Sequence, residues 1–338
     1  MPKKTMKAVV FDKPTSASDG FAALDAREVE IPDYSTSTVV VRTALAPINP
    51  SDLLFTAGSF PGPVQASFPG QVAGISGAGY LASDQRGAES TSQRLFHYTT
   101  PGTWADYVAV PEESLIELPS NYPIELAAQF SNVVTAWQLI ENSGVQAGQW
   151  LALTAGNSTV ALIALQFAVQ KGINVVSVAR RRHPGVDLTS HGAAAVIFPS
   201  ESDSSLHDTV LEKTDGKPIS GVIDCVAGHQ LGELIRACEP FSRVLLYGCL
   251  DESGLDVTGP DIMYRFVNIE PYSYPFTFVP PRTESDHNML RDVIGASTGG
   301  KISVDTAGIF ALENFREALD GHLNGKLPGK FFLAASTE

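Results

Sequence analysis

Cysteine and metal-binding patterns are scarce in this chain. Its 338 residues include three cysteines, Cys225, Cys238 and Cys249. An odd number at wide spacing does not suit a disulfide framework, so we expect reduced, buried thiols. The seven histidines are scattered, and neither a Cys-x-x-Cys nor a His-x-x-x-His pair occurs. Zinc needs clustered ligands, so the sequence predicts no metal site.

Long hydrophobic runs and positive charge are also lacking. No apolar run approaches the ~20 residues that span a bilayer. The apolar stretch 8–11 after the basic N-terminus is too short for a signal peptide, so we expect a soluble, cytoplasmic protein. Lys and Arg total 23 against 37 Asp and Glu, a net charge of −14. Such a surface repels nucleic acid and anionic lipid, which excludes both as expected partners, but a local basic cluster can still hold a small anion.

What is present is the composition of a globular protein, with 43% hydrophobic and 18% charged residues. The length predicts about two domains. Residues 1–120 are rich in Pro, Gly, Ser and Thr, and short β-type runs at 7–11, 38–44 and 103–110 are separated by turn residues. They predict a mostly antiparallel β domain, in which the polar stretch 82–93 is a surface loop.

A regular alternation of strands and helices begins near residue 123. The strands are continuous Val/Ile/Leu-rich runs, which is typical of parallel strands buried on both faces. The sequence therefore predicts an α/β fold with a doubly wound parallel sheet of the dinucleotide-binding type. The predicted strands are 150–154, 174–179, 194–198, 221–226 and 243–247, and the predicted helices are 124–129, 135–142, 158–171, 186–191, 204–214 and 230–238.

The C-terminal segment has a residue pattern like that of the N-terminal segment. It predicts helices at 288–296 and 312–323 and a closing strand at 330–334. We therefore expect residues 1–122 and 280–338 to form one domain, into which the α/β unit 123–279 is inserted.

The turn between the first α/β strand and its helix is a candidate phosphate site. The N–H groups of a helix N-terminus and the helix dipole favour a pyrophosphate there. Of the usual glycine fingerprint only Gly156 is present, while Asn157 and Ser158 supply donors and good helix caps. Thr159 and Ala161 stand where small side chains are normally found. The alternative is an ordinary capped helix in a flavodoxin-like or other α/β domain.

Three consecutive arginines, Arg180, Arg181 and Arg182, follow the second α/β strand. In a dinucleotide fold an acidic residue there accepts from a ribose 2′-hydroxyl, whereas Arg accommodates a 2′-phosphate. Guanidinium groups bind phosphate through paired donors. The sequence therefore favours NADP(H) over NAD(H). The alternative is a solvated loop with incidental arginines.

These features resemble the medium-chain dehydrogenase/reductase superfamily over nearly the whole chain. Within it, the segments are most similar to mitochondrial-type trans-2-enoyl-thioester reductases, with quinone oxidoreductases next. The resemblance implies a Rossmann-type sheet inserted into a GroES-like β-rich domain, and a homodimer formed by sheet extension near 268–274. Zinc-containing relatives have ligands in the first domain, where this chain has no Cys, so it is similar to the zinc-free branch. The matching segments are 46–52, 102–107, 132–137, 155–160 and 180–182.

The resemblance also implies functional residues by position. Asn49, in the segment Asn-Pro-Ser-Asp, is the candidate catalytic residue. The expected cofactor is NADPH, and the residues that would bind it are Asn132, Thr135, Asn157, Ser158, Thr159, Val160, Arg180, Arg181, Arg182, Tyr247, Gly248, Cys249, Leu250, Tyr272, Ser273, Tyr274 and Lys330.

One departure concerns the proton donor. The enoyl reductases carry a Tyr shortly after the Asn-Pro-Ser-Asp segment, and alignment puts Phe60 there, which cannot donate a proton. Candidate substitutes are Ser59, Tyr98, Tyr272 and Tyr274. The predicted function is a zinc-independent, NADPH-dependent reductase of an activated C=C bond or a quinone. The alternative is a non-catalytic NADPH-binding sensor or structural protein.

Overall fold

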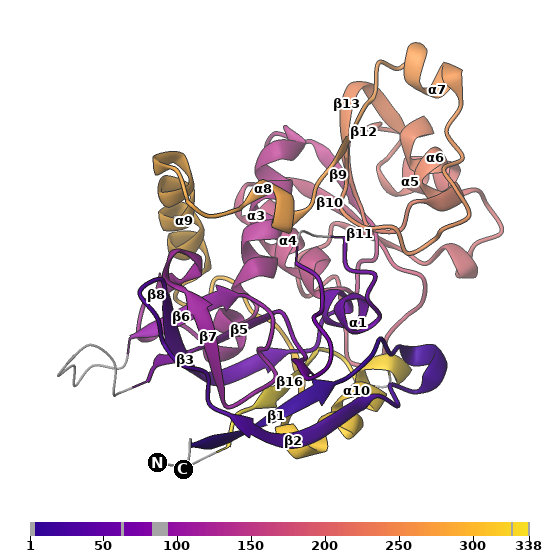
Figure 1. Ribbon diagram of the computed structural model, residues 1–338. Coiled ribbons are helices and arrows are strands. Elements are labelled where there is room, and N and C mark those ends of the chain that lie inside the picture. Colours follow the sequence, from indigo (N-terminus) through magenta and orange to yellow (C-terminus); the bar gives the residue numbers. More distant parts are fainter. Residues whose placement is uncertain (1–3, 62–63, 83–93, 326, 337–338) are drawn as a thin grey trace. The chain divides into compact units, whose positions relative to one another are not determined.

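The computed structural model describes residues 4–61, 64–82, 94–325 and 327–336. It divides the chain into two compact units (Figure 1). Unit 1 comprises residues 1–131, 278–294 and 304–338, and unit 2 comprises residues 132–277 and 295–303. Most of the predicted surface loop 82–93 lies outside the described residues.

The boundaries between the units differ from the predicted ones at 122/123 and 279/280. Unit 1 extends to residue 131 because the ring of Phe130 packs edge-on against the rings of His97 and Tyr122. The short segment 295–303 belongs to unit 2, where the side chain of Gln166 accepts from the backbone N–H of Ser303 and donates to its carbonyl oxygen.

Unit 1 contains two β-sheets. The larger has the order β15-β16-β3-β5-β6-β8, with β7 also paired to β3, and the smaller has the order β2-β1-β4. All pairs except β15–β16 are antiparallel, as the sequence predicted. The strands are β1 (Thr5–Phe11), β2 (Leu24–Glu30), β3 (Thr38–Pro47), β4 (Gln71–Val72), β5 (Ser76–Leu81), β6 (Leu95–Thr99), β7 (Tyr107–Pro111), β8 (Ile116–Leu118), β15 (Thr306–Ala311) and β16 (Lys330–Ala334).

The C-terminal strand β16 pairs with β3, so the C-terminal segment joins a sheet formed by strands of the first segment. The predicted strand 103–110 is shorter than expected. It begins at Tyr107, because Trp104 hydrogen-bonds instead to Ala73 and Val9 of other segments. The helices of this unit are α1 (Pro50–Thr56), α2 (Ile124–Ala128), most of α9 (Glu284–Ser297) and α10 (Phe315–Asn324).

Unit 2 is a six-stranded, fully parallel sheet with helices. Its strand order, β11-β10-β9-β12-β13-β14, confirms the dinucleotide-type arrangement, in which the first strand lies near the centre. The strands are β9 (Trp150–Leu153), β10 (Asn174–Val178), β11 (Ala195–Ile197), β12 (Ile219–Asp224), β13 (Cys238–Leu246) and β14 (Asn268–Pro271). The helices are α3 (Phe130–Ser143, which starts in unit 1), α4 (Thr159–Gln170), α5 (Leu206–Lys213), α6 (Gly228–Arg236), α7 (Gly259–Met263) and α8 (Tyr274–Thr277).

The predicted helix 186–191 is wrong, because the structure has turns there. Pro184 and Gly185 precede the segment, and Gly192 follows it with φ 101°. The Asp187 carboxylate accepts from the backbone N–H of Thr189, a local bond that competes with helix formation. None of the helices in the described ranges is long and apolar enough to cross a membrane.

Candidate functional site

The turn after β9 is fixed against the neighbouring strand β10. The N–H of Gly156 donates to the carbonyl oxygen of Val178 at 2.9 Å. A Cβ on Gly156 would lie 2.3 Å from Oγ of Ser177, so only glycine allows this approach. Ala155 has φ 48°, a conformation unusual for a residue with a side chain. Gly156 is the one glycine of the usual fingerprint that this chain has. The close packing of β9 and β10 requires a glycine at this position.

The N-terminus of α4 presents unsatisfied donors at the end of this turn. Ser158 is the helix cap, and its Oγ accepts from the N–H of Ala161. Thr159 and Val160 lead the helix, so their N–H groups have no acceptor within it. Together with the helix dipole they favour an anion. The side chain of Asn157 donates to the carbonyl oxygen of Arg181 at 3.0 Å, which ties this turn to the arginines.

The three arginines after β10 differ in their surroundings. All three side chains are exposed. Arg182 forms a bidentate ion pair with Glu201, with N–O distances of 3.0 and 3.1 Å, and lies 4.5 Å from the ring centre of Phe198. No ion pair of Arg180 or Arg181 occurs within the described ranges. Two guanidinium groups thus remain available for an external anion.

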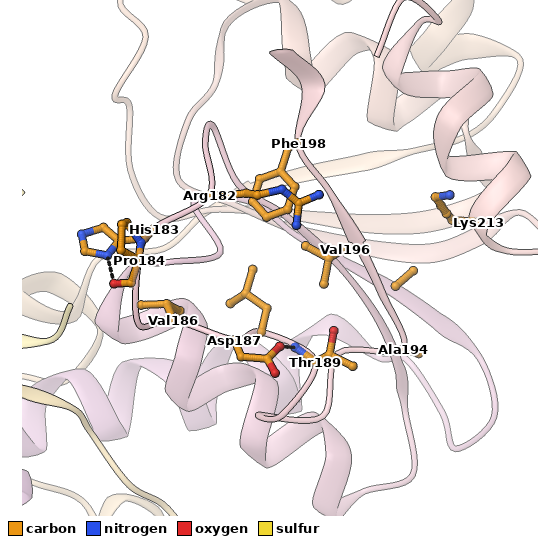
Figure 2. Close-up of a pocket in the computed structure, with 12 residues that line it drawn as sticks. Arg182, His183, Pro184, Val186, Asp187, Thr189, Ala194, Val196, Phe198 and Lys213 are labelled. Atoms are coloured by element: carbon orange, nitrogen blue, oxygen red, sulfur yellow. Dashed lines mark hydrogen bonds between the residues drawn. The ribbon is translucent and has the colours of Figure 1, made fainter. Parts of the chain in front are cut away.

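Arg182 also forms part of the wall of a hollow of about 700 Å³ beside β11 (Figure 2). Val196 and Phe198 line it, and Lys213 lies at its far end. Figure 2 shows the Arg182 side chain lying across the Phe198 ring. The predicted role of Arg182 in cofactor binding remains a prediction, and its guanidinium already has two partners.

A buried carboxylate joins the carboxyl ends of β9 and β12. Asp224 is fully buried, and its oxygens accept from the hydroxyl of Thr154 at 2.7 Å and from the N–H of Ala227 at 2.6 Å. Burial raises the pKa of Asp224, and these hydrogen bonds oppose the shift. Ala227 has φ 65° and ψ −142°, a strained combination that glycine adopts readily. No pattern in the sequence predicted this linkage.

The segment after β13 lies against the segment after β12. Tyr247 N–H donates to the carbonyl oxygen of Asp224, and Leu250 N–H donates to that of Cys225. A Cβ on Gly248 would lie 2.5 Å from Sγ of Cys225, so this position also requires glycine. The predicted cofactor residues 247–250 therefore lie at the carboxyl ends of the parallel strands, the same end of the sheet as the candidate phosphate turn.

The cysteines are free thiols, as expected, but they are not all buried. Cys238 is buried, and Cys225 is partly buried. Cys249 is exposed, which corrects the prediction, because it lies in a loop beyond the end of β13 and not in the strand itself.

The segment after β14 contacts α3. The hydroxyl of Tyr272 donates to Oε1 of Gln138 on that helix. Burial raises the pKa of Tyr272 to about 12, although hydrogen bonds with the hydroxyls of Thr277 and Thr135 lower it. Asn132 and Thr135 lie on α3, and residues 273 and 274 follow Tyr272 directly. All predicted cofactor residues except Lys330 thus belong to unit 2.

Asn49 and Lys330 lie together in unit 1. Nζ of Lys330 donates to Oδ1 of Asn49 at 2.7 Å and to the carbonyl oxygen of Ile48 at 3.1 Å. Asp52 is fully buried beside them, and its two oxygens accept from the N–H groups of Asn49 at 2.7 Å and Ile75 at 2.8 Å. Burial raises the pKa of Asp52 to about 7 and lowers that of Lys330 to about 8.

The ring of Phe60 carries no hydroxyl, and the four candidate substitutes for the proton donor have different surroundings. Phe60 packs against the apolar core of unit 1. Tyr98, one candidate substitute, is fully buried and donates to Thr43, and burial raises its pKa. Tyr272 is engaged with Gln138, as described above. Ser59 is exposed and Tyr274 is partly buried.

Comparisons with known proteins agree with this fold. Residues 159–276 match the family described as zinc-binding dehydrogenase. The mitochondrial enoyl-[acyl-carrier-protein] reductase of Xenopus tropicalis is 26% identical over 87% of this chain and 86% of its own length. Its Arabidopsis thaliana counterpart is 24% identical over 95% and 85%. A putative NADPH:quinone reductase from Bacillus thuringiensis superposes with TM-score 0.84 at 22% identity, covering 99% and 100% of the two chains.

The parallel sheet of unit 2, the returning C-terminal strand of unit 1 and these similarities define an oxidoreductase fold. These similarities agree with the resemblance to the medium-chain dehydrogenase/reductase superfamily that the sequence indicates. Within it, the chain is similar to enoyl reductases and quinone oxidoreductases. A structure described as the Etr1p/NADP/crotonyl-CoA complex has TM-score 0.83 at 20% identity, covering 98% and 100% of the two chains.

The description of the matched family raises the question of zinc. Within the ranges that the structure describes, no three His, Cys, Asp or Glu side chains gather in a way that could hold a metal ion. All three cysteines lie in unit 2, whereas the zinc ligands of related proteins were expected in the first domain.

Proposed function

We propose that this protein is a zinc-independent, NADPH-dependent reductase of an activated C=C bond, in an α,β-unsaturated carbonyl compound or an enoyl thioester, or of a quinone. The observation that carries the proposal is the pairing of an open helix N-terminus with Arg180 and Arg181 at one edge of a parallel sheet. The relatives named enoyl reductase and NADPH:quinone reductase support the same chemistry.

The residues present fit NADPH. Thr159 and Val160 of α4 would hold the pyrophosphate, and Arg180 and Arg181 would bind the 2′-phosphate. When bound, NADPH supplies a hydride to the electrophilic carbon of the acceptor, and the second hydrogen arrives as a proton. The chain's own residues orient the acceptor, exclude water and stabilise the oxygen on which negative charge develops.

The second candidate is a non-catalytic NADPH-binding protein. Phe60 favours it, since this apolar side chain packs into the core where the enoyl reductases carry a hydroxyl. Fold alone does not separate the two functions.

The deciding experiment measures NADPH binding by calorimetry and NADPH oxidation with a crotonyl thioester, an enal, an enone and a quinone. We expect binding and oxidation with at least one acceptor, with NADPH preferred over NADH. Binding without turnover on any acceptor would favour the second candidate, and absence of binding would exclude both. Elemental analysis completes the test, because stoichiometric zinc would contradict zinc independence.

The proposal includes a homodimer. Strand β14 is the edge of the unit 2 sheet, and beside it the rings of Phe241 and Phe266 stack at 5.0 Å while both remain mostly exposed. Met263 and Tyr264 are 67% and 77% exposed. Exposed apolar side chains beside an open strand edge favour pairing with a second copy.

Substitution Phe266→Asp is expected to convert the dimer to a monomer, because a carboxylate in the contact would be desolvated without a partner. Light scattering on eluted fractions measures the mass. A monomeric unsubstituted protein would contradict the proposal. The cytoplasmic location stays a prediction, since several relatives are named as mitochondrial proteins.

A further inference from the structure

Two free thiols lie opposite each other where β12 and β13 end. The N–H of Leu250, the residue after Cys249, donates to the carbonyl oxygen of Cys225 at 3.2 Å. A parallel bridge pairs Ala227 with Asp251, which have the same separation along the chain as the two cysteines. The hydrogen bond and the bridge therefore share one parallel register, and this register places Cys249 opposite Cys225.

The spacing of the two residues suits a disulfide. Neighbouring strands lie about 4.8 Å apart, and opposite residues project to the same face. A disulfide joins Cα atoms about 4.4–6.8 Å apart. A Cβ on Gly248 would lie 2.5 Å from Sγ of Cys225, so this sulfur rests against the main chain directly before Cys249. The register and the direction of the Cys225 side chain thus bring the two thiols to one place.

The surroundings of the two thiols set the order in which they react. Cys249 is exposed, and its Sγ donates only a weak hydrogen bond, at 3.4 Å, to the carbonyl oxygen of Asp251. Cys225 is partly buried, and burial raises its pKa to about 11. Oxidants attack exposed thiols with thiolate character first. Cys249 is therefore the group that an oxidant reaches first, and Cys225 is the second thiol beside it.

We propose that Cys225 and Cys249 form a site of oxidative modification, at which a peroxide converts the two thiols to a disulfide. The inference does not depend on the proposed reductase activity. The bond would fasten the segment 247–250, which contains predicted cofactor residues, to the end of β12.

The reaction takes place in two steps. The sulfur of Cys249 attacks one oxygen of hydrogen peroxide, the O–O bond breaks, and the thiol proton leaves with the other oxygen as water. The sulfur of Cys225 then attacks the sulfenic acid on Cys249, the S–O bond breaks, and the S–S bond forms. The proton of Cys225 leaves with the hydroxide as a second water. The two thiols together lose two electrons, which reduce one peroxide.

Peptide mapping tests the site. The reduced full chain is treated with one equivalent of hydrogen peroxide under native conditions, and the remaining thiols are then alkylated in denaturant. Cleavage by trypsin after Lys and Arg places each cysteine in its own peptide; in chain order these are 214–236, 237–243 and 244–265. Mass spectrometry without reductant should show the first joined to the third and the second alkylated. Dithiothreitol should separate the joined peptides.

Serine variants test the order of the two steps. In Cys225→Ser the reaction should stop at the sulfenic acid, so dimedone, which labels this group, should label the peptide 244–265. In Cys249→Ser the remaining thiols should be lost about tenfold more slowly or less, because the exposed thiol is gone. The matched control is Cys238→Ser. Cys238 is buried and donates to the carbonyl oxygen of Leu234 at 3.3 Å, so its loss should leave the rate of disulfide formation unchanged.

Three alkylated peptides after peroxide treatment would overturn the inference. A disulfide that includes the peptide 237–243, or one that joins two chains, would overturn it as well. So would equal dimedone labelling of the unsubstituted protein and Cys225→Ser, because Cys225 would then not complete the reaction. The map of the unsubstituted protein decides the outcome even where a serine variant fails to fold. None of these measurements uses NADPH or an acceptor, so failure of the inference is distinguishable from failure of the proposed function.

Discussion

Replacing Arg180 and Arg181 together by alanine is expected to weaken NADPH binding about 100-fold or more, since each charge-assisted hydrogen bond to phosphate contributes about 1.5–3 kcal/mol. The affinity for NADH, which lacks the 2′-phosphate, should change by less than about threefold. Titration calorimetry of both cofactors against the double variant and the unsubstituted protein measures the two effects.

Arg182→Ala is the matched control. Its guanidinium is held by Glu201 and stacked on Phe198, so its loss should cost less than tenfold in NADPH affinity, roughly one weak hydrogen bond. A larger loss from Arg182→Ala than from the double variant would show that the ion pair with Glu201 opens for the cofactor. Equal affinity of the unsubstituted protein for NADPH and NADH would contradict the arginine site altogether.

Asp52→Ala is expected to lower the free energy of unfolding by about 3–5 kcal/mol, the range found when one member of a buried charged group is removed. Two buried N–H groups, of Asn49 and Ile75, would lose their acceptor, and Lys330 would lose a nearby negative charge. Asp52→Asn keeps one oxygen acceptor and should cost clearly less. Urea unfolding at constant pH measures both, and equal losses would contradict the role of the two hydrogen bonds.

The same carboxyl makes stability depend on pH. Burial raises the pKa of Asp52 from 3.8 to about 7, so between these values the folded state binds more protons than the unfolded state. Its contribution to stability therefore falls as the pH rises through this window. Asp52→Asn should remove that fall.

Lys330 acts in the opposite direction at higher pH. Its pKa is lowered from 10.5 to about 8, so stability should rise between these values as the unfolded state holds the extra proton. The pKa of His322 is lowered from 6.5 to about 4 by burial and then by the Lys330 charge, so His322 titrates within the Asp52 window and makes stability rise with pH there, which opposes the effect of Asp52.

Most strands and helices of unit 2 were predictable from sequence, although the short helices α7 and α8 were not predicted. Parallel strands are buried on both faces, so β9 is a continuous apolar run and β10 is rich in Val without polar alternation. The helix expected at 186–191 failed because a six-residue pattern carries too little signal against the local hydrogen bond from Thr189 to Asp187.

The candidate site also has features that local sequence predicts and features that it does not. Local sequence was enough to predict the candidate phosphate turn, since Gly156, the Ser158 cap and the arginines lie within 30 residues of one another. It could not reveal that Arg182 pairs with Glu201, because exposed ion pairs have no sequence periodicity. It also left Asn49 and Lys330 as separate predictions, although their side chains meet across 281 residues of chain.

By itself, then, the sequence was enough to predict most of the elements, the resemblance to a superfamily and a candidate anion-binding turn, because each depends on patterns of neighbouring residues. Only the tertiary structure decided which charges are buried and what they touch. Pairing of β16 with β3 brings Lys330 onto Asn49, and burial changes the proton affinity of Asp52. Desolvation is a property of the assembled fold, so no local pattern of residues encodes it.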